Sequence, residues 1–445
     1  MKNTLRNKGL ASLSLLVLGF SLSCSPKNKI LLQQNKVVVN ITIDEGQGSF
    51  APCEPSISIS PVNPNLVTAG SVLNNVYHSE DAGKTWRKEI LKSSFGVYGD
   101  PVVRYDGLGN VYYAHLSNPK NKAYSSEEFL DRIVVQKLSN SSNTWSNGTF
   151  PLADKKKDHD KQWIVVNPID QSLTMTWTQF DKYGSKLERD KTNVLFSISK
   201  DQGETWSESI IINEVSGDCV DDDLTNEGAF TAVGIDGSIM AVWARDSKIW
   251  FDRSTDGGKN WLKSDKAIAD QIGGWSMDIP GIDRTNGFPI LKVDHSNGKY
   301  RGRVYMSWTD QRNGSDNTDV WIIHSDDHGQ HWSQAIKVNN DSGKAAHQFF
   351  HSMDLDQSSG YVYLLFYDRR NYQDAHNDVY LAYTTNGGKD FVNTKVSETS
   401  FLSEKIVFFG DYTDISAVQG KVRPIWTHQE GKVLKIKTAL IDIGI

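Results

Sequence analysis

The sequence predicts an all-β protein built from repeated four-stranded units, and two observations predict it. The first is an eight-residue cassette with the consensus Ser-x-Asp-x-Gly-x-Thr-Trp, which recurs at 79–86, 199–206, 254–261 and 325–332. A fifth copy at 384–391 keeps the glycine and an aromatic end, and a weak sixth lies at 138–145. The second is the pattern between cassettes, where short runs rich in Val and aromatic residues alternate with Gly, Asn and Asp turns. Self-similarity of this kind indicates a repeat architecture made of strands.

The cassette has the composition of a turn between two strands. Its Asp side chain can accept hydrogen bonds from backbone amides further along the turn, and its Gly can adopt the positive φ that closes the turn. The terminal aromatic residue would pack between neighbouring sheets. We therefore expect the cassette aspartates to be structural and not catalytic.

The chain begins with an expected export signal at residues 1–23. A basic head precedes an apolar run over 10–22 that is too short to span a bilayer. The run ends at Cys24 in a context that resembles a lipoprotein signal-peptidase site, so we expect lipidation of Cys24 and a tether over 24–35. Ordinary secretion with an unmodified thiol is the alternative. The protein is then expected to be exported and lipid-anchored to a bacterial membrane, in the periplasm or at the cell surface.

The composition favours one large body with a substantial core. Of 445 residues, 38% are hydrophobic and 13 are Trp, while the formal net charge is −6. This charge gives no reason to expect nucleic acid as a partner, and a membrane is expected only through the lipid anchor. We expect a monomer. Because an exported protein meets an oxidising environment, Cys53 and Cys219 are expected to form a disulfide, with two unpaired buried thiols as the alternative.

Four-stranded units repeated around an axis are the blades of a β-propeller. Seven candidate innermost strands lie near Ser56, Val102, Ile164, Thr231, Ile290, Ser352 and Thr413. The last unit has no cassette and no fourth strand of its own. The run at 36–43 could supply that strand and close the ring by pairing the two ends of the chain. We therefore expect one propeller over 36–445, with seven blades favoured and six possible.

The cassette resembles the Asp-box, or bacterial neuraminidase repeat, of the sialidase superfamily, and the resemblance covers residues 50–440. It implies an exported glycan-processing protein of the bacterial sialidase-like branch. True sialidases use three arginines for the sialic acid carboxylate, a Tyr nucleophile activated by a Glu, and an Asp acid/base. They also carry an Arg-Ile-Pro motif before the first cassette, whereas this chain has no Arg between Arg6 and Arg87. Asp-boxes also occur in propellers with other glycan chemistry or none.

The expected topology places the chemistry on the face opposite the cassette turns, where innermost strands begin and second strands end. Two carboxylates can act as proton donor and as nucleophile or base, arginine can pair with an anionic sugar, and aromatic rings can stack on sugars. The candidate catalytic residues on this face are Asp100, Asp160, Glu227, Asp411 and Tyr412. The candidate substrate-binding residues are Arg245, Arg312, Arg369, Arg370, Trp163 and His159.

Each of these groups also has a structural interpretation. Carboxylates before an inner strand can cap backbone amides of the next blade, and Asp–Arg pairs after second strands can join loops. Trp residues at strand ends can pack between blades. No cofactor is indicated, although the acidic run at 218–223 could bind Ca²⁺; it has no EF-hand spacing, and a solvated loop is the alternative.

We therefore expect an exo-acting glycoside hydrolase that acts on a terminal acidic sugar of a glycan. The alternative is a non-catalytic propeller that binds carbohydrate or protein on the same face. The carboxylates at the channel distinguish the hydrolase from the binding module. In a binding module these carboxylates would all accept hydrogen bonds from backbone amides, and none would be left for catalysis.

Overall fold

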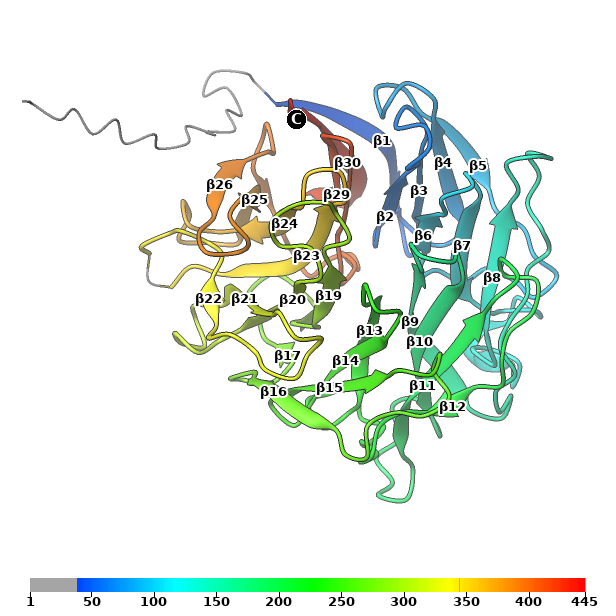
Figure 1. The fold of residues 1–445 in the computed structure, drawn as a ribbon. Helices are drawn as coiled ribbons and strands as arrows, with labels where there is room; N and C mark the ends of the chain where they lie inside the picture. The colour runs from blue at the N-terminus through cyan, green and yellow to red at the C-terminus, as the bar shows by residue number, and fades with distance from the viewer. Residues whose placement is uncertain (1–37, 344, 445) are drawn as a thin grey trace, which may run out of the picture.

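A computed structural model describes residues 38–343 and 345–444. Seven antiparallel sheets are arranged as a ring around a central channel (Figure 1). Each sheet is one blade, and in blades 1 to 6 the strands follow one another in chain order from the channel outward. The predicted β-propeller with seven blades is therefore confirmed.

Blades 1 to 4 come first along the chain. Blade 1 contains β2 (Ser56–Ile59), β3 (Val67–Ser71), β4 (Asn75–Ser79) and β5 (Arg87–Ile90). Blade 2 contains β6 (Val102–Tyr105), β7 (Val111–Leu116), the 3-10 turn η1 (Ala123–Ser125) and β8 (Ile133–Leu138). Blade 3 contains β9 (Asp158–Val166), β10 (Leu173–Phe180), β11 (Thr192–Ser199) and β12 (Ile210–Ile211). Blade 4 contains β13 (Glu227–Val233), β14 (Ile239–Arg245), β15 (Lys248–Ser254) and β16 (Lys266–Asp270).

Blades 5 to 7 complete the ring. Blade 5 contains β19 (Ile290–Val293), β20 (Val304–Asp310), β21 (Asp319–Ser325) and β22 (Ile336–Lys337). Blade 6 contains β23 (Gln348–Asp356), β24 (Tyr361–Asp368), β25 (His376–Thr384), β26 (Val392–Lys395) and the short β27 (Phe401–Leu402). Blade 7 contains β28 (Asp414–Val418), β29 (Lys421–Glu430), β30 (Val433–Asp442) and β1 (Val39–Gln47). A separate hairpin, β17 (Ser276–Met277) and β18 (Thr285–Asn286), lies between blades 4 and 5.

The ring closes by pairing strands from the two ends of the chain. β1 runs antiparallel to β30, from Val39 opposite Leu440 to Gln47 opposite Val433. The N-terminal strand predicted over 36–43 is thus present as the fourth strand of blade 7, with bounds shifted toward the C-terminus. Blade 2, which has the weakest cassette, is less regular, because only two isolated bridges stand in the place of its fourth strand.

The cassette turns have the predicted chemistry. In the first, Asp81 Oδ1 accepts hydrogen bonds from the amides of Lys84 at 3.0 Å and Thr85 at 2.9 Å, and its Oδ2 accepts one from the Thr85 hydroxyl at 2.7 Å. Gly83 in the same turn has a φ of +89°. The bonds from the amide and side chain four residues on recur at Asp201, Asp256 and Asp327. The cassette aspartates therefore stabilise turns, as expected.

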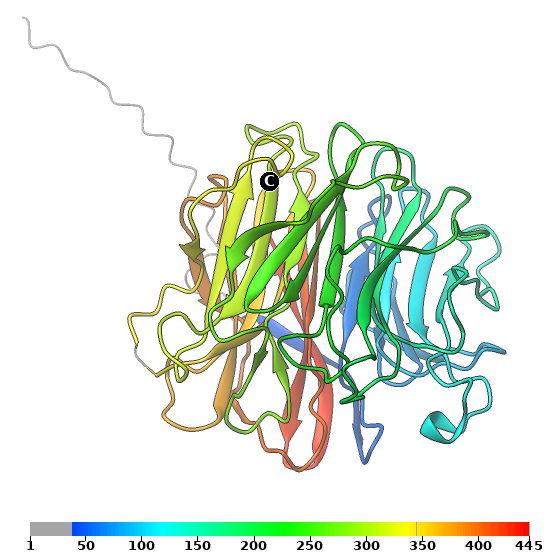
Figure 2. The same ribbon diagram turned by 90° about the horizontal axis from the view of Figure 1, so that it is seen from below.

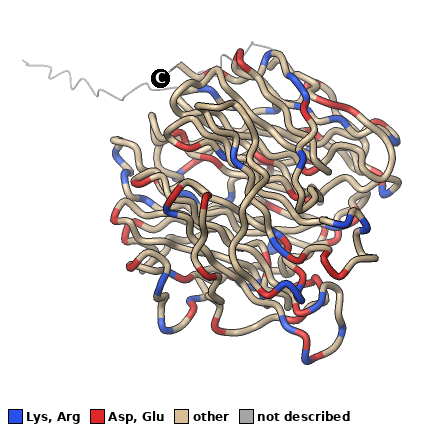
Figure 3. The backbone as a smooth tube through the Cα atoms, turned by 90° about the vertical axis from the view of Figure 1, so that its right-hand side faces the viewer, with Lys and Arg blue, Asp and Glu red and all other residues tan. Residues whose placement is uncertain are grey.

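The ring has two different faces (Figure 2). The cassette turns join third strands to fourth strands on one face, where innermost strands end. The opposite face, which we call the mouth face, carries the starts of the innermost strands. In Figure 2 it is at the bottom, where the β29–β30 connection and the β17–β18 hairpin protrude. Acidic and basic residues are interspersed around the outside of the ring (Figure 3).

Carboxylates do cap neighbouring blades, but they are not the acids predicted at the mouth. Asp414 Oδ2 accepts a hydrogen bond from the amide of Ile57 at 3.1 Å, which links blade 7 to blade 1. Asp354 Oδ2 accepts one from the amide of Ala417 at 2.8 Å, which links blade 6 to blade 7. Both aspartates belong to their strands. The acids that precede the innermost strands are therefore not needed to cap the backbone at these two places.

Three innermost strands contain the same β-bulge near their start. In β9, β13 and β23 the inner strand advances three residues while its partner advances two, at 160–163, 227–230 and 349–352. Each bulge contains a residue of positive φ: Lys161 at 51°, Gly228 at 66° and Phe350 at 47°. Because a bulge bends a strand and re-aims its side chains, these bulges set the direction of the residues at the channel mouth.

The predicted disulfide is wrong, because Cys53 and Cys219 are both buried free thiols. Cys53 lies before β2 in an apolar cluster that includes Phe349 and Tyr367. Cys219 lies in the connection from β12 to β13, where it meets the backbone of Lys182. The ring therefore holds the two thiols in different surroundings.

The expected signal at 1–23, the lipidation site Cys24 and the tether over 24–35 lie outside the described residues. Among the residues that are described, no helix has the length and apolar composition needed to cross a bilayer.

Candidate active site

A cavity lies at the mouth end of the channel. Blades 2 to 7 contribute to it, and its polar lining includes Asp100, Lys161, Gln162, Asn286, Asp411 and Tyr412. Trp163 lines the same cavity, with its ring 5.9 Å from that of Tyr412. The structure thus brings Asp100, Asp411, Tyr412 and Trp163 together, as predicted from their positions before or at the start of innermost strands.

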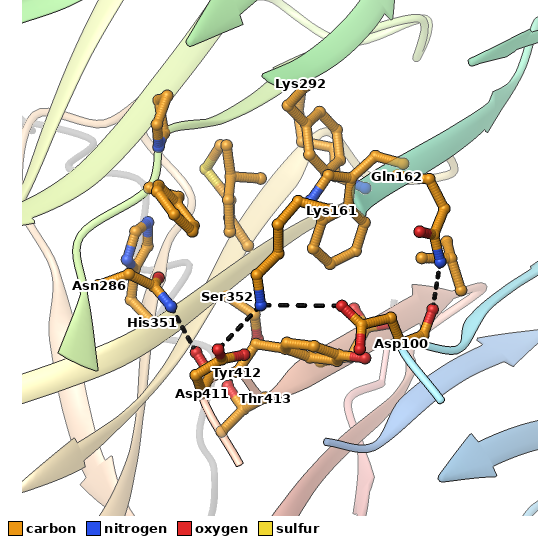
Figure 4. A pocket seen from close by; sticks show the side chains of 18 of the residues that line it. Asp100, Lys161, Gln162, Asn286, Lys292, His351, Ser352, Asp411, Tyr412 and Thr413 are labelled. Carbon is orange, nitrogen blue, oxygen red and sulfur yellow. Dashed lines mark hydrogen bonds and ion pairs between the residues drawn. The ribbon is translucent and has the colours of Figure 1, made fainter. Parts of the chain in front are cut away.

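Lys161 is the centre of this site. Figure 4 shows its side chain reaching between Asp411 and Asp100. Its Nζ is 2.8 Å from Asp411 Oδ2 and 3.7 Å from Asp100 Oδ2. Burial alone would lower the pKa of Lys161, but the two carboxylates raise it well above its ordinary value. Lys161 is therefore a fixed positive charge, aimed into the channel by the bulge in β9.

Arg284 brings a second cation to the same carboxylate. It lies in the β17–β18 hairpin, and its Nη2 is 2.8 Å from Asp411 Oδ2. Its Nη1 is 3.7 Å from Asp221 Oδ2, which accepts a hydrogen bond of 2.5 Å from the Tyr183 hydroxyl. The guanidinium also stands over the ring of Phe408, at 5.3 Å. The hairpin thus extends the site beyond the seven blades.

Asp411 is the ionised carboxylate of the site. Burial raises its pKa, but the charges of Lys161 and Arg284 outweigh burial and hold the pKa below its ordinary value. Both cations contact Oδ2. Oδ1 is buried and has no hydrogen-bond partner among the described residues. One oxygen of this carboxylate is therefore held by two cations, while the buried Oδ1 is left to the neighbouring carboxyl group of Glu54.

The neighbouring acids favour the protonated form. Burial raises the pKa of Glu54 well above its ordinary value, and the nearby carboxylates of Asp100 and Asp411 add to the effect. Burial, followed by the charge of Asp100, raises the pKa of Asp160 to about 7. Asp160 and Asp100 are hydrogen-bonded to each other through their side chains, and Glu54 is bonded in the same way to Asp411. An ionised carboxylate and proton-carrying carboxyls therefore stand side by side around Lys161.

Glu227 and Tyr412 are more deeply placed than predicted. Glu227 is fully buried and does not line the cavity. Burial and then the Asp221 carboxylate raise its pKa, so it holds a proton. The Tyr412 hydroxyl is buried without a partner in the described part of the chain, and burial raises its pKa well above the ordinary value.

The four arginines predicted to bind substrate do not line the cavity. Arg312 pairs with Asp310 at 2.6 Å, and Arg370 pairs with Asp368 at 2.7 Å. Arg369 is buried against Asn377 and Ser403, and Arg245 stands over the Trp250 ring. These four arginines therefore have structural roles, because each contacts a side chain of its own blade and does not extend to the channel.

His159 is also structural. It is fully buried, its Nδ1 accepts a hydrogen bond from Trp177 Nε1 at 2.9 Å, and its Nε2 lies 3.0 Å from the carbonyl oxygen of Asp154. Burial lowers its pKa, so it is neutral. It braces β9 against β10 beside the site and has no surface for a ligand.

Sequence reasoning missed Lys161 and Arg284 as parts of this charge network, whereas Glu54 was among the carboxylates expected at the start of an innermost strand. Lys161 directly follows Asp160, and Glu54 precedes β2 as the other acids precede their strands. This position at the start of an innermost strand can be recognised in the sequence. Arg284 lies in a hairpin outside the repeat, so no spacing pattern points to it.

The acidic run at 218–223 is used in local hydrogen bonds. Asp223 accepts bonds from Ser247 and from the amide of Trp275, and Asp218 accepts one from Thr225. Within residues 38–343 and 345–444, no group of three or more His, Cys, Asp or Glu side chains is arranged to hold a metal ion.

No family model matches the chain, and no curated protein matches its sequence. Among solved structures, an ulvan lyase, a polysaccharide lyase bound to -[GlcA(1-4)Rha3S]-, has a TM-score of 0.54 at 11% identity, covering 91% of this chain and 96% of that one. A protein of unknown function from Dyadobacter fermentans has a TM-score of 0.50 at 13% identity, with coverages of 92% and 99%. A Hadza microbial sialidase has a TM-score of 0.45 at 12% identity, with coverages of 85% and 73%. The likeness concerns the fold, and the predicted membership of the sialidase superfamily stays a prediction.

Proposed function

We propose that the protein is an exported glycoside hydrolase that removes a terminal sugar at the channel mouth. The observation that carries the proposal is the arrangement of carboxyl groups around Lys161, whose Nζ is 2.8 Å from Asp411 Oδ2 and 3.7 Å from Asp100 Oδ2. The cations hold the pKa of Asp411 below its ordinary value, while burial raises the pKa of Asp160 to about 7. A hydrolase of this type needs a proton donor and an ionised carboxylate around one glycosidic bond. We base the proposal on the site, because the likeness to known structures concerns the fold alone.

In this mechanism the Asp100–Asp160 pair is the proton donor. The proton of Asp160 passes to Asp100, which lines the cavity, and from there to the glycosidic oxygen. The bond from that oxygen to the anomeric carbon breaks, and the electron pair stays with the leaving oxygen. The ionised Asp411 faces the positive charge that develops on the sugar. Water then supplies the hydroxyl group at the anomeric carbon, and its remaining proton returns to the carboxylates.

The shape of the cavity favours action on the end of a glycan. Arg104, Phe230 and Lys292 line both this cavity and a second one at the other end of the channel, so they form a floor between the two. Trp163 and Tyr412 provide aromatic walls on which a sugar ring can stack. A sugar at the end of a chain fits a cavity with such a floor, whereas an internal sugar needs an open groove.

The predicted acidic sugar would meet Arg284 at the mouth. Arg284 does not line the cavity, but its guanidinium is 46% exposed and contacts Asp411, which does line it. The expected lipid anchor also fits the geometry, because β1 begins at Val39, beside Leu440 near the end of a third strand. An anchor before β1 would hold the cassette face toward the membrane and leave the mouth face directed outward.

The test is hydrolysis of a panel of aryl glycosides that includes neutral sugars, uronic acids and sialic acid. We expect turnover of at least one, with kcat/KM reduced by about 10²- to 10⁴-fold in Asp160→Asn and Asp411→Asn. Asp278→Asn, a substitution of a 92% exposed aspartate in the β17–β18 hairpin, is the matched control. Activity should fall as the pH rises through about 7, because Asp160 then loses its proton.

Absence of turnover across the panel would contradict the hydrolase. If the protein still bound glycans, the alternative of a non-catalytic propeller would hold. An unsaturated product would instead indicate elimination, which breaks the bond without adding water.

A further inference from the structure

An exposed aromatic platform lies on blade 2, beside the mouth. It consists of Tyr98, Tyr124 and Phe129. Tyr124, in η1, is 72% exposed, and its ring packs edge to face on Phe129 with 4.7 Å between ring centres. Phe129 packs in the same way on Tyr98, also at 4.7 Å. Phe129 is buried in the core shared by blades 2 and 3, so the platform is fixed to the scaffold.

The platform stands over the acids of the mouth. Packing of its ring raises the pKa of Tyr124, the Asp160 carboxylate raises it further, and Arg284 lowers it. The backbone also joins the platform to Asp160, because the carbonyl oxygen of Leu130, next to Phe129, accepts a hydrogen bond of 2.8 Å from the amide of His159, the residue before Asp160. Tyr98 is joined to Asp100 through Gly99 alone. The platform therefore borders the proton-donating pair.

The site described above does not use this platform. Tyr124 does not line the cavity, and among the large apolar side chains exposed on the described chain it has the highest fractional exposure. Tyr residues are enriched at binding interfaces, because they combine an apolar ring with a hydroxyl group that stays in water. A planar ring of this kind, with a polar hydroxyl at its edge, suits the apolar face of a sugar.

We propose that the platform binds the sugar on the leaving side of the bond that is cut, so that the substrate is an oligosaccharide or a longer glycan. This rests on the proposed function, because it takes the Asp100–Asp160 pair as the proton donor. The donor delivers its proton to the oxygen that departs with the leaving sugar. The sugar next to this pair is therefore the leaving one, and the platform is on that side.

The test measures binding to an array of immobilised monosaccharides and oligosaccharides, with Asp160→Asn present in every protein to prevent turnover. Tyr124→Ala should weaken binding to oligosaccharides roughly tenfold relative to monosaccharides, as expected for the loss of one stacking ring. Tyr124→Phe keeps the ring and should bind like the parent. Phe50→Ala is the matched control, because Phe50 is 58% exposed in the connection from β1 to β2.

Oligosaccharide binding that is unchanged in Tyr124→Ala, or a parent that binds no oligosaccharide, would overturn the platform. A loss that is equal for monosaccharides and oligosaccharides would also overturn it, because the ring would then belong to the terminal-sugar site. These outcomes are independent of the hydrolase test, since the array requires no turnover. The two tests can therefore give different answers. If no aryl glycoside is hydrolysed but Tyr124→Ala selectively weakens oligosaccharide binding, the proposed binding surface is supported and the proposed hydrolase activity is contradicted.

Discussion

The aspartates of the cassette turns and the acids of the channel mouth are the same chemical group in opposite surroundings. Asp81 accepts two backbone and two side-chain hydrogen bonds, and these bonds lower its pKa to about 2. Glu227 is fully buried, and neither of its oxygens accepts a hydrogen bond from a donor in the described chain, so its pKa is raised. The repeated acids that are conspicuous in the sequence therefore stabilise the fold, while the dispersed acids carry the unusual proton chemistry.

The two sets contribute to stability with opposite dependence on pH. A lowered pKa stabilises the folded state above the unfolded value of about 4, and this contribution is lost as the pH falls through about 2 at Asp81. A raised pKa stabilises the protonated folded state at low pH, and this contribution is lost as the pH rises through about 7 at Asp160. The mouth acids therefore make the fold less stable as the pH rises, and the cassette acids make it more stable.

The largest effect is expected from Lys161→Met, which removes a cation from the mouth. Its loss leaves the buried carboxylates of Asp411 and Asp100 with Arg284 as compensation, and we expect the free energy of unfolding to fall by about 3–5 kcal/mol at pH 8. The loss should be smaller at pH 5, because the acids can then take up protons. Urea unfolding at the two pH values measures it. Lys248→Met, which breaks an exposed pair with Asp270, should cost less than about 1 kcal/mol at either pH.

A smaller effect is expected from Gly329→Ala in the cassette of blade 5. The glycine has a φ of +82°, and a Cβ would lie 2.2 Å from Phe251 Cζ in the neighbouring blade. We expect the free energy of unfolding to fall by about 2–4 kcal/mol, from backbone strain and overpacking together. Gly237→Ala has a similar φ of +80° with open space around it, and should cost about 1 kcal/mol. Equal losses in chemical unfolding would show that the contact between blades is unimportant.

Glu227→Gln is expected to stabilise the protein, which would be unusual for a buried acid. The amide cannot ionise, and it can still donate a hydrogen bond to Asp221 in place of the carboxyl proton. We expect the variant to equal the parent at pH 5 and to be more stable by about 1–2 kcal/mol at pH 9. Thermal unfolding across this pH range is the measurement. A variant that is less stable at every pH would show that Glu227 is held as a carboxylate.

The smallest effect is expected from Asp81→Ala, which removes one of several equivalent turns. The loss should be about 1 kcal/mol near neutral pH, as for a lost helix cap, and should shrink as the pH approaches 2. Glu80→Ala in the same cassette is the control, because Glu80 is exposed and contributes no acceptor to the turn. If Asp81→Ala had no effect at neutral pH, the cassette hydrogen bonds would not be what holds the turn.

Much of the fold could be predicted because its causes are local and repeated. An Asp, a Gly and an aromatic residue at fixed offsets make a turn wherever they occur, and Val-rich runs between turns make strands. The missing fourth strand of the last unit then indicated ring closure by the N-terminal strand. Blade 2 departs from the pattern where its cassette has lost the Asp and the Gly.

One rule predicted part of the site: residues just before or at the start of the innermost strands meet on one face of the ring. That rule found Asp100, Asp160, Asp411 and Tyr412. It failed for Arg312 and Arg370, because an aspartate two residues earlier in each strand is a closer partner than any group in the channel. It failed for the two cysteines, because spacing along the chain does not give distance across a ring.

The sequence by itself determined the repeat, the strands and the turns, since each depends on contacts between residues close together in the chain, and it favoured seven blades over six. The tertiary structure decided which acids are charged. A bulge aims Lys161 at carboxylates from blades 2 and 7, and a hairpin outside the repeat adds Arg284. Charge and burial at the mouth arise from residues up to several hundred positions apart, so their balance exists only once the ring has closed.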